Sequence, residues 1–460
     1  MEVVKSFIDA GNKFLWSFFL IVLLCGTGIY YTIKLRFIRL RRLGEGFKVI
    51  FGSFSLKGSS HENGEMSAFQ AIVTAIAAQV GNGALAGAAT ALVGGGPGAI
   101  FWMWVAGFFG MATNYGEAVL TQTYKEEKDG EMTGGPVYYI RAAFPGLGGK
   151  VLSVFFAIML IIALGFMGNM VQSNSIGVAF AEAFAVLDIH ISPVIVTAVV
   201  AALAGFIFFG GTNRLAGVLE KLVPIMAGIY ILGSLTFIFM HITKLPEAFM
   251  QILIGAFDPQ AIMGGAMGIT VKEAIRYGVA RGLFANEAGM GSTPHAHARA
   301  KVKTADEQGL CAMVSVFIDT YIILNLTVFV ILTSGTLGSG ATGINLTQGA
   351  FVSGFGQFGL FFVAFCLFFF AFSTVLGWQF FGAVNVEYLF GKKAVYVYSA
   401  IVVLCIVVGA LLKVNLVWEM ADFFNGLMII PNVLALIKSV HVVRDTKVCS
   451  TYGEEAKETA

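Results

Sequence analysis

Two short clusters of glycine and polar residues interrupt segments that are otherwise apolar, and these are the places where the chain is equipped to bind a ligand. The clusters comprise Gln79, Gly81, Asn82 and Gly83 within residues 79–87, and Phe284, Asn286, Glu287 and Gly289 within residues 282–291. Closely spaced glycines destabilise a helix, and an asparagine side chain competes for backbone hydrogen bonds. Each cluster therefore predicts a helix that unwinds for about one turn.

An unwound turn frees backbone N–H and C=O groups from their helical partners. Inside a hydrocarbon layer each freed group costs several kcal/mol unless another group satisfies it. A zwitterionic amino acid and a cation would do so, with the N-terminus of a half-helix holding the carboxylate and freed carbonyls holding the cation. The alternative is a glycine-rich surface for close helix packing, which would bind nothing.

Two further helices contribute candidate residues. Ser373 and Thr374 lie in the middle of an apolar run, where their hydroxyls could complete an oxygen shell for sodium. Such hydroxyls also bond commonly to the carbonyl of the preceding turn. Trp378, one turn further on, is a candidate wall of the pocket, and Phe166 and Asn169 are candidates from another apolar run.

Three acidic residues lie within apolar segments, where a carboxylate is costly and marks function by default. For Glu287 two interpretations stay open: a role in coupling, or an ion pair with Arg276 or Arg281. For Glu117 and Asp319 we expect structural ion pairs.

No enzyme signature is present in the sequence. His295 and His297 are two residues apart and would not face one another on a helix, so they make a poor metal pair. The five cysteines lack the spacing of metal ligands, and no phosphate-binding loop occurs. We therefore expect no enzymatic activity and no cofactor other than a coupling ion.

The composition is that of an all-α membrane protein. Of 460 residues, 57% are hydrophobic and 12% are charged, against about 25% charged in soluble domains. The net charge of +2 gives no reason to expect a nucleic-acid partner; the oligomeric state stays open. Apolar runs long enough to cross a bilayer predict eleven spans, near residues 14–34, 67–92, 97–123, 150–172, 193–210, 218–242, 274–297, 308–334, 357–386, 394–412 and 415–438.

Basic residues set the expected orientation. The segment after the first span is rich in lysine and arginine, as are alternate loops thereafter, and such loops stay in the cytoplasm. The N-terminus is therefore predicted outside and the C-terminus inside, in a cytoplasmic (inner) membrane.

The two glycine clusters lie five predicted spans apart, which divides the chain. With the first span set aside, ten spans remain as five plus five, and an odd number per half requires the halves to be inverted. The expected organisation is an extra N-terminal helix with a basic segment (1–65), a first repeat (66–242), a second repeat (243–440) and a cytoplasmic tail (441–460).

Three stretches resemble a known family, the alanine or glycine:cation symporters of the amino acid–polyamine–cation superfamily. They read GGGPGAIFWMWV (94–105) with GMAT (110–113), GGPVYYI (134–140), and RGLFANEAGMGS (281–292) with PHAHA (294–298). The resemblance covers nearly the whole chain. It implies a LeuT-like core preceded by one extra helix, alanine or glycine as substrate, and coupling to sodium or protons.

The resemblance also implies which residues bind. The substrate region would lie at the two interrupted helices, and sodium would be held by carbonyls near Ala77 and Val80 with Ser373 and Thr374. Where the family usually has Gly-Thr-Gly-Asn, this chain has Gly81-Asn82-Gly83-Ala84. A polar amino acid such as glutamine or serine is therefore a second candidate substrate, and an amino-acid-gated channel or sensor is an alternative function.

Overall fold

The computed structural model describes residues 2–52, 66–128, 130–263, 269–412 and 414–458, and almost all of them are helical. The first quarter contains α1 (Glu2–Phe14), the π-helix η1 (Leu15–Phe19), α2 (Leu20–Lys34), α3 (Ile38–Gly52), β1 (Met66–Ser67), α4 (Ala68–Gln79), the π-helix η3 (Gly83–Gly87), α5 (Ala88–Gly95) and α6 (Gly98–Thr123).

The middle of the chain continues with β2 (Glu126–Lys128), β3 (Glu131–Thr133), α7 (Pro136–Ala143), α8 (Leu147–Leu160), the π-helix η4 (Ile161–Gly168), α9 (Asn169–Ala185), α10 (Pro193–Phe208), α11 (Gly211–Met240), η5 (Ile242–Lys244), α12 (Leu245–Gly255), α13 (Pro259–Met263), α14 (Val271–Asn286), α15 (Pro294–Ala298) and β4 (Ala300–Lys301). The last third consists of α16 (Ala305–Phe317), the π-helix η6 (Ile318–Ile323), α17 (Leu324–Ser334), η7 (Thr336–Gly338), α18 (Gly343–Phe355), α19 (Phe358–Phe390), α20 (Lys392–Val408) and α21 (Val414–Glu458).

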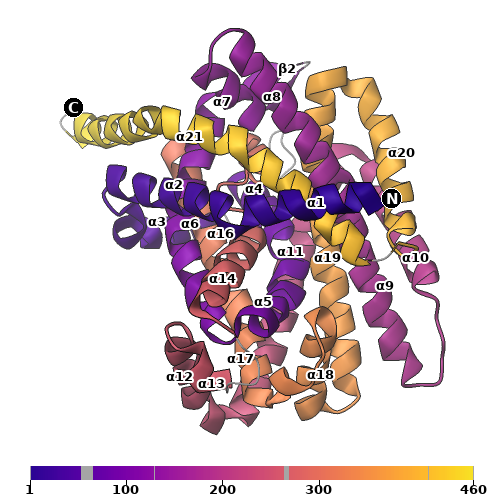
Figure 1. Ribbon diagram of the computed structural model, residues 1–460. Coiled ribbons are helices and arrows are strands. Elements are labelled where there is room, and N and C mark those ends of the chain that lie inside the picture. The colour runs from indigo at the N-terminus through magenta and orange to yellow at the C-terminus, as the bar shows by residue number, and fades with distance from the viewer. Residues whose placement is uncertain (1, 53–65, 129, 264–268, 413, 459–460) are drawn as a thin grey trace.

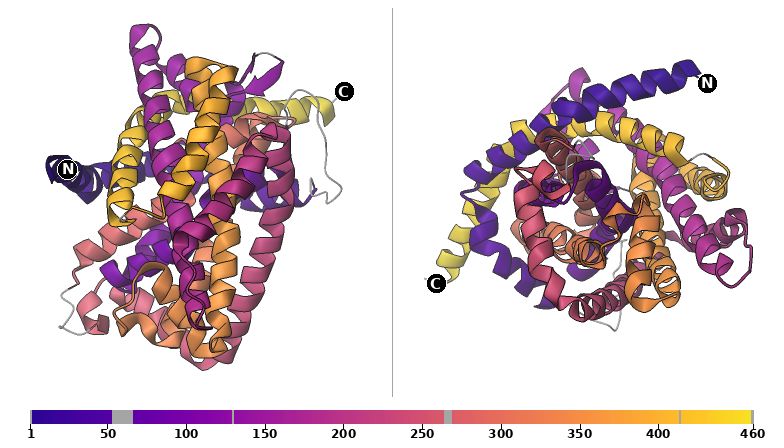
Figure 2. Two further views of the ribbon diagram at one scale, coloured as in Figure 1. Left: turned by 90° about the vertical axis from the view of Figure 1, so that its right-hand side faces the viewer. Right: turned by 60° about the horizontal axis from the view of Figure 1, so that its bottom comes forward.

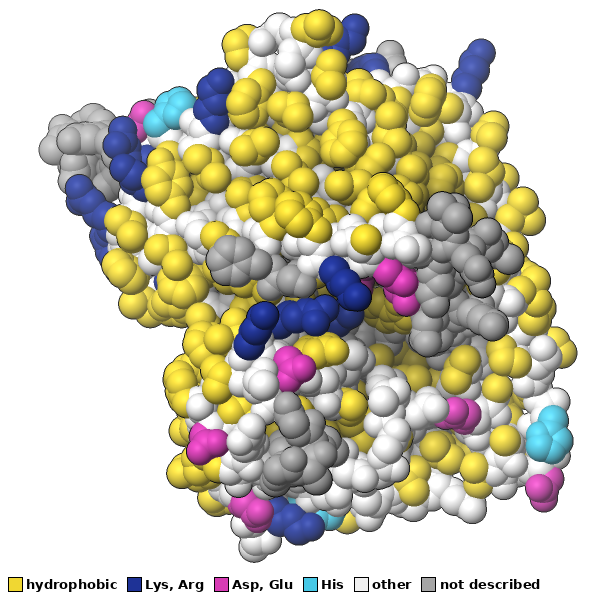
Figure 3. All heavy atoms as spheres, viewed as in Figure 1, with side chains coloured by type: hydrophobic (Ala, Val, Ile, Leu, Met, Phe, Trp, Pro, Cys, Tyr) yellow, Lys and Arg dark blue, Asp and Glu magenta, His cyan; other side chains and the backbone are white. Residues whose placement is uncertain are grey.

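The helices form a bundle that is built to lie in a bilayer. In the part of the chain that the structure describes, five helical segments are long and apolar enough to cross a membrane: Leu147–Ala185, Gly211–Met240, Ala305–Ser334, Phe358–Phe390 and Val417–Thr446. The number rises to seven if each of two bent pairs counts as one span, so the count of eleven stays a prediction. Large hydrophobic side chains are exposed along these helices, and a broad apolar area covers the upper part of the face in Figure 3. Such a surface is stable in lipid and not in water.

The N-terminal helices and α21 lie around one side of the bundle (Figures 1 and 2). The Asn12 side chain donates to the backbone carbonyl of Glu419 at 2.8 Å, and the Trp16 indole donates to that of Asp422 at 3.0 Å. The basic segment after the first span, predicted as a loop, contains the helix α3, which bends from α2 by 84°. The remainder of that segment, 53–65, lies outside the described residues.

The two predicted interruptions are confirmed. Helix α4 ends at Gln79 and the chain resumes as η3 and α5, with a bend of 45°. Helix α14 ends at Asn286, and Glu287 adopts a left-handed conformation with φ of 53°. The backbone then runs without helix to Pro294, where α15 begins.

Short strands and helices lie next to the ends of the two broken helices and of their neighbours. Strands β1 and β4 pair in parallel, which joins Met66 before α4 to Ala300 after α15. Strands β2 and β3 form an antiparallel hairpin ahead of α7. The short helix α7 follows this hairpin, and the short helix α12 follows η5. The division into two inverted halves stays a prediction.

Candidate substrate and cation site

The two interrupted helices meet in the centre of the bundle. The Gln79 side chain, at the end of α4, donates from Nε2 to the backbone carbonyl of Asn286 at 2.8 Å. A Cβ atom added to Gly83 would lie 3.2 Å from the Cα of Ala285, so the two backbones approach closely. The sequence predicted two breaks, and the fold places them side by side.

In the first break, Asn82 is held by helix α9. Its backbone N–H donates to Gln172 Oε1 at 3.2 Å, and its Nδ2 donates to Ser175 Oγ at 2.7 Å. The Ser175 hydroxyl itself donates to a carbonyl of its own helix, which fixes the amide orientation of Asn82. Gln172 and Ser175 were not predicted, although five polar residues occur within positions 169–175 of an otherwise apolar segment, which is a signal in the sequence.

The second break is stabilised by Glu117 of α6. The backbone N–H groups of Gly289 and Gly291 donate to its two carboxylate oxygens at 3.0 and 2.9 Å. Asn432 of α21 donates to Glu117 Oε1 at 2.7 Å and to the Gly289 carbonyl at 2.9 Å. The hydroxyl of Tyr139 in turn donates to Asn432 Oδ1. The carboxylate thus replaces the helical acceptors that these backbone groups have lost.

The expected ion pairs of Glu117 and Asp319 are wrong. Within the described ranges no basic side chain pairs with either residue, and Glu117 binds backbone N–H groups instead. A carboxylate can accept several hydrogen bonds, so an interrupted helix is as good a partner for it as an arginine.

Glu287 is bound by Trp378 and not by an arginine. The indole N–H donates to Glu287 Oε1 at 2.7 Å, and the Ser292 hydroxyl donates to Oε2. Arg281 pairs instead with Asp422 at 3.3 Å, so the alternative of an Arg281–Glu287 pair is wrong. Trp378 therefore joins α19 to the second break, where it was predicted to wall the pocket.

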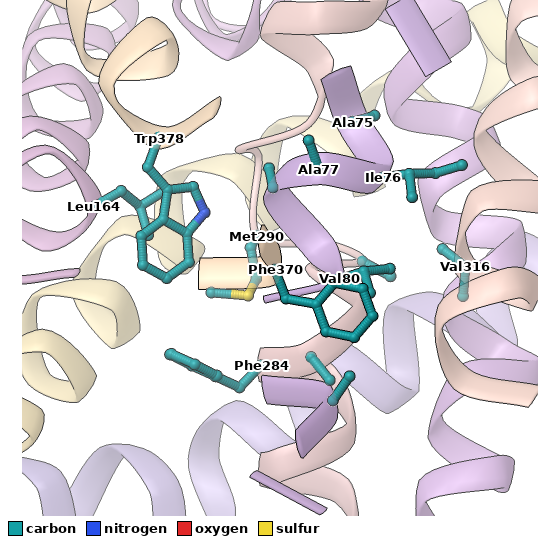
Figure 4. Close-up of a cluster of buried hydrophobic side chains, with 14 of the residues drawn as sticks. Ala75, Ile76, Ala77, Val80, Leu164, Phe284, Met290, Val316, Phe370 and Trp378 are labelled. Carbon is teal, nitrogen blue, oxygen red and sulfur yellow. The ribbon is translucent and has the colours of Figure 1, made fainter. Parts of the chain in front are cut away.

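The aromatic side chains lie together at the second break (Figure 4). The rings of Phe284 and Trp378 are 6.5 Å apart and edge to face, and those of Phe284 and Trp418 are 5.5 Å apart. A Cβ added to Gly168 would lie 2.5 Å from the Trp378 ring, so this indole also packs against η4.

Three of the four predicted cation ligands lie together. The Thr374 hydroxyl lies 2.8 Å from the carbonyl oxygen of Ala77, and the Ser373 hydroxyl 3.4 Å from the same atom. Both hydroxyls also donate to the carbonyl of Phe370 in the preceding turn, as their alternative interpretation expected, and the sodium role of these hydroxyls stays a prediction. No described hydrogen bond places the Val80 carbonyl with this group, although its residue directly follows α4.

Phe166 and Asn169 lie on the side of the site formed by η4 and α9. The Phe166 ring packs on Tyr398 of α20, with centroids 5.6 Å apart. The Asn169 side chain donates to the Gly165 carbonyl of its own helix at 2.9 Å. The described contacts therefore join neither residue to the two breaks.

A cavity of about 570 Å³ extends to the breaks from the side of the protein that carries Thr342–Asn345, and Asn82 and Phe284 line it. A second cavity of about 380 Å³ shares Phe284 and the Arg281–Asp422 pair with it. In the view of Figure 3, basic and acidic side chains lie close together below the apolar area. Within the described residues, this cavity therefore gives access to the first break from one side of the protein.

The opposite side is joined by ion pairs and hydrogen bonds. Glu131 lies 3.3 Å from Arg299 and 3.2 Å from Lys392, which connects β3 to the segment after α15 and to the start of α20. The Gln122 side chain donates to the carbonyls of His297 and Ala300 at 2.5 and 3.0 Å. The arrangement suits a site that is reached from one face at a time.

Comparisons with known proteins agree with this architecture. The fold is LeuT-like: the chain is similar to the solved structure of MhsT in complex with L-phenylalanine, with a TM-score of 0.57 and 15% identity over 84% of this chain and 100% of that one. Among curated relatives, it is 41% identical to the sodium/alanine symporter AgcS of Methanococcus maripaludis, over 96% of each chain. It is 37% identical to the amino-acid carrier protein AlsT of Bacillus subtilis, over 99% of this chain and 93% of that one.

A further relative at 37% identity is the probable sodium/glutamine symporter GlnT of Bacillus subtilis, matched over 96% of this chain and 90% of that one. The family model that describes the sodium:alanine symporter family matches residues 1–460. A whole-length match of this kind, on a bundle with two helices broken at the same centre, places the chain among transporters and not enzymes. It is a member of the sodium:alanine symporter family.

Proposed function

We propose that this protein is a secondary active symporter that imports a small neutral amino acid, alanine or glycine, together with sodium. The observation that carries the proposal is the meeting of the two broken helices, joined by Gln79 and Asn286, at a cavity that reaches Asn82. Sodium is the only cofactor proposed. The membrane is the cytoplasmic one, with the N-terminus outside and the C-terminus in the cytoplasm.

The amino acid has two charges, and the site offers a partner for each. The positive dipole end of the η3–α5 half-helix, at its N-terminus, would attract the carboxylate. At Glu287 the backbone takes a left-handed conformation, and the carbonyls freed beyond it suit an ammonium group. The buried aromatic rings of Phe284 and Trp378 would contact the small apolar side chain of such a substrate.

The sodium ion would bind at the Ala77 carbonyl, with the hydroxyls of Ser373 and Thr374 turned to present their oxygens. Ala77 lies in the last turn of α4, and the amino-acid site starts at the break that follows it. Because α4 and α19 both contribute to this ion site, bound sodium would hold the first break in one geometry. This is how sodium would raise the affinity for the amino acid.

Access would alternate between the two faces. With the orientation predicted from the basic loops, the 570 Å³ cavity opens to the outside and the Glu131 ion pairs close the cytoplasmic side. Import would require the Glu131 contacts to separate after the cavity has closed over the substrate.

A polar amino acid such as glutamine is the second candidate substrate. The Oδ1 atom of Asn82 is buried and has no hydrogen-bond partner among the described residues, so it offers an acceptor to a substrate amide. The relative GlnT, named for glutamine, supports keeping this candidate.

Uptake into liposomes that contain the purified protein tests the proposal. Labelled alanine should accumulate when a sodium gradient is directed inward, and a proton gradient alone should give no accumulation. Unlabelled alanine and glycine should compete more strongly than serine or glutamine. Equal uptake with and without the sodium gradient would contradict coupling to sodium. Stronger competition by glutamine than by alanine or glycine would show that the second candidate, glutamine, is the substrate.

A further inference from the structure

Asp319 is a buried acid for which the proposed transport cycle has no role so far. It lies in the π-helix η6, between α16 and α17, and its side chain is fully buried. Neither carboxylate oxygen has a hydrogen-bond partner among the residues that the structure describes. An ionised carboxylate in such a place is costly unless a positive charge lies beside it.

Among the described residues, none of those that surround Asp319 supplies such a charge. Glu287 is the charged group that acts on it electrostatically, and its charge has the same sign. Thr320, the next residue, interacts with Asp319 through its side chain, but a hydroxyl is neutral and adds no positive charge; the same hydroxyl accepts a hydrogen bond from Asn286 at 3.2 Å. The balance of charge at this point therefore calls for a cation.

Nearby unpartnered atoms are acceptors as well. Gln79 Oε1 is buried without a described partner, and its amide orientation is fixed because Nε2 donates to the carbonyl of Asn286. Asn286 in turn bonds to Thr320, so one chain of hydrogen bonds runs from the first break to the residue beside Asp319. Oxygen atoms without donors are the ligands that hard cations prefer.

The local backbone is irregular on both sides of this position. Segment η6 is a π-helix, in which the N–H of Leu324 donates to the carbonyl of Asp319, and it packs against the π-helix η3 that follows the first break. Such π-segments occur frequently at functional sites because they displace backbone groups from their regular partners. Two irregular segments thus meet where the uncompensated carboxylate lies.

We infer that the Asp319 carboxylate is a ligand of a second sodium ion, separate from the ion proposed at Ala77, Ser373 and Thr374. Asp319 belongs to η6 and the two hydroxyls to α19. Val316 lies one turn before Asp319. In the view of Figure 4, the segment with Ala77 and Val80 lies between Val316 and Trp378 of α19. This inference rests on the proposed symport, and it implies two sodium ions for each amino acid.

The sodium stoichiometry of the unaltered protein in liposomes is the test. At zero membrane potential, a tenfold sodium gradient supports about tenfold accumulation of alanine with one ion and about hundredfold with two, because the free energies of the ions add. We expect accumulation well above tenfold. An accumulation limit near tenfold would overturn the second sodium site. Acidification of the liposome interior during alanine entry would overturn it as well, because a proton would then neutralise Asp319 in place of sodium.

The variant Asp319→Asn tests the residue itself. It removes the negative charge with little change of shape, so the accumulation limit should fall from about hundredfold to about tenfold. The exposed variant Asp445→Asn is the matched control and should keep the limit of the unaltered protein. An unchanged limit in Asp319→Asn would overturn the assignment. Uptake that does not depend on sodium at all would instead contradict the proposed symport. If Asp319→Asn fails to fold, the sodium stoichiometry of the unaltered protein still tests whether a second sodium ion is bound.

Discussion

Replacing Gly81 by alanine is expected to raise the sodium concentration needed for alanine uptake by at least about tenfold while the protein still folds. A Cβ atom at position 81 would lie well inside van der Waals contact of the Thr374 hydroxyl, one of the proposed sodium ligands. Overpacking of this kind costs about 1–3 kcal/mol. Because the displaced atom is a ligand, most of that cost should appear as lost ion affinity, which corresponds to roughly a tenfold to hundredfold change.

The measurement is the sodium concentration that gives half-maximal alanine uptake. Gly228→Ala is the matched control, since Gly228 also lies within a membrane helix and a Cβ added there would meet no atom within 4 Å. We expect Gly81→Ala to need at least about tenfold more sodium and Gly228→Ala to need the same amount as the unaltered protein. An unchanged sodium requirement in Gly81→Ala would remove Thr374 from the ion site.

Replacing Glu117 by glutamine should both destabilise the protein and stop transport. The carboxylate accepts hydrogen bonds from the backbone of Gly289 and Gly291 and from the side chain of Asn432. An amide retains one acceptor oxygen and turns an N–H donor toward the remaining groups. Hydrogen bonds to a charged group contribute about 1.5–3 kcal/mol each, so we expect a loss of about 2–3 kcal/mol.

Thermal unfolding and uptake are to be measured on the same preparation of Glu117→Gln. The melting temperature should fall by several degrees, and uptake should drop below a tenth of normal because the second break loses its geometry. Glu247→Gln is the control, since that carboxylate is exposed and its described bond is to Gln251 in the same helix. Normal uptake and melting of Glu117→Gln would mean that the break holds its geometry without the carboxylate.

The sequence was sufficient to predict the fold class and both helix breaks. Spaced glycines and an asparagine act locally, within one turn, and their effect on a helix does not depend on distant residues. Long apolar runs likewise predict membrane helices from length alone. For these reasons the breaks at Gly81–Gly83 and after Asn286 appear where the composition of each segment placed them.

The partners of the breaks were beyond the reach of sequence analysis. Glu117 bonds to Gly289 and Gly291, and Asn432 lies more than three hundred positions from Glu117 in the chain. No spacing rule connects such residues, because only the packing of whole helices brings them together. The sequence shows that an acid inside the membrane needs a partner. It does not show whether that partner is a set of backbone N–H groups or an arginine side chain.

One local prediction, for the segment that follows the first span, is wrong. The basic stretch after the first span was predicted as a loop because of its charge, yet residues Ile38–Gly52 form α3. Arg39 of this helix is buried, and its guanidinium lies 3.5 Å from the centroid of the Phe108 ring. A charge that lies over an aromatic ring at a helix interface does not mark a solvated loop.

A structure solved in the presence of alanine and sodium tests the central claim most directly. The account predicts that the amino acid lies between residues 80–83 and 286–289, within hydrogen-bond distance of the backbone freed at both breaks, and that a sodium ion contacts the Ala77 carbonyl. Alanine bound away from both segments, or continuous helix through them facing lipid, would contradict it.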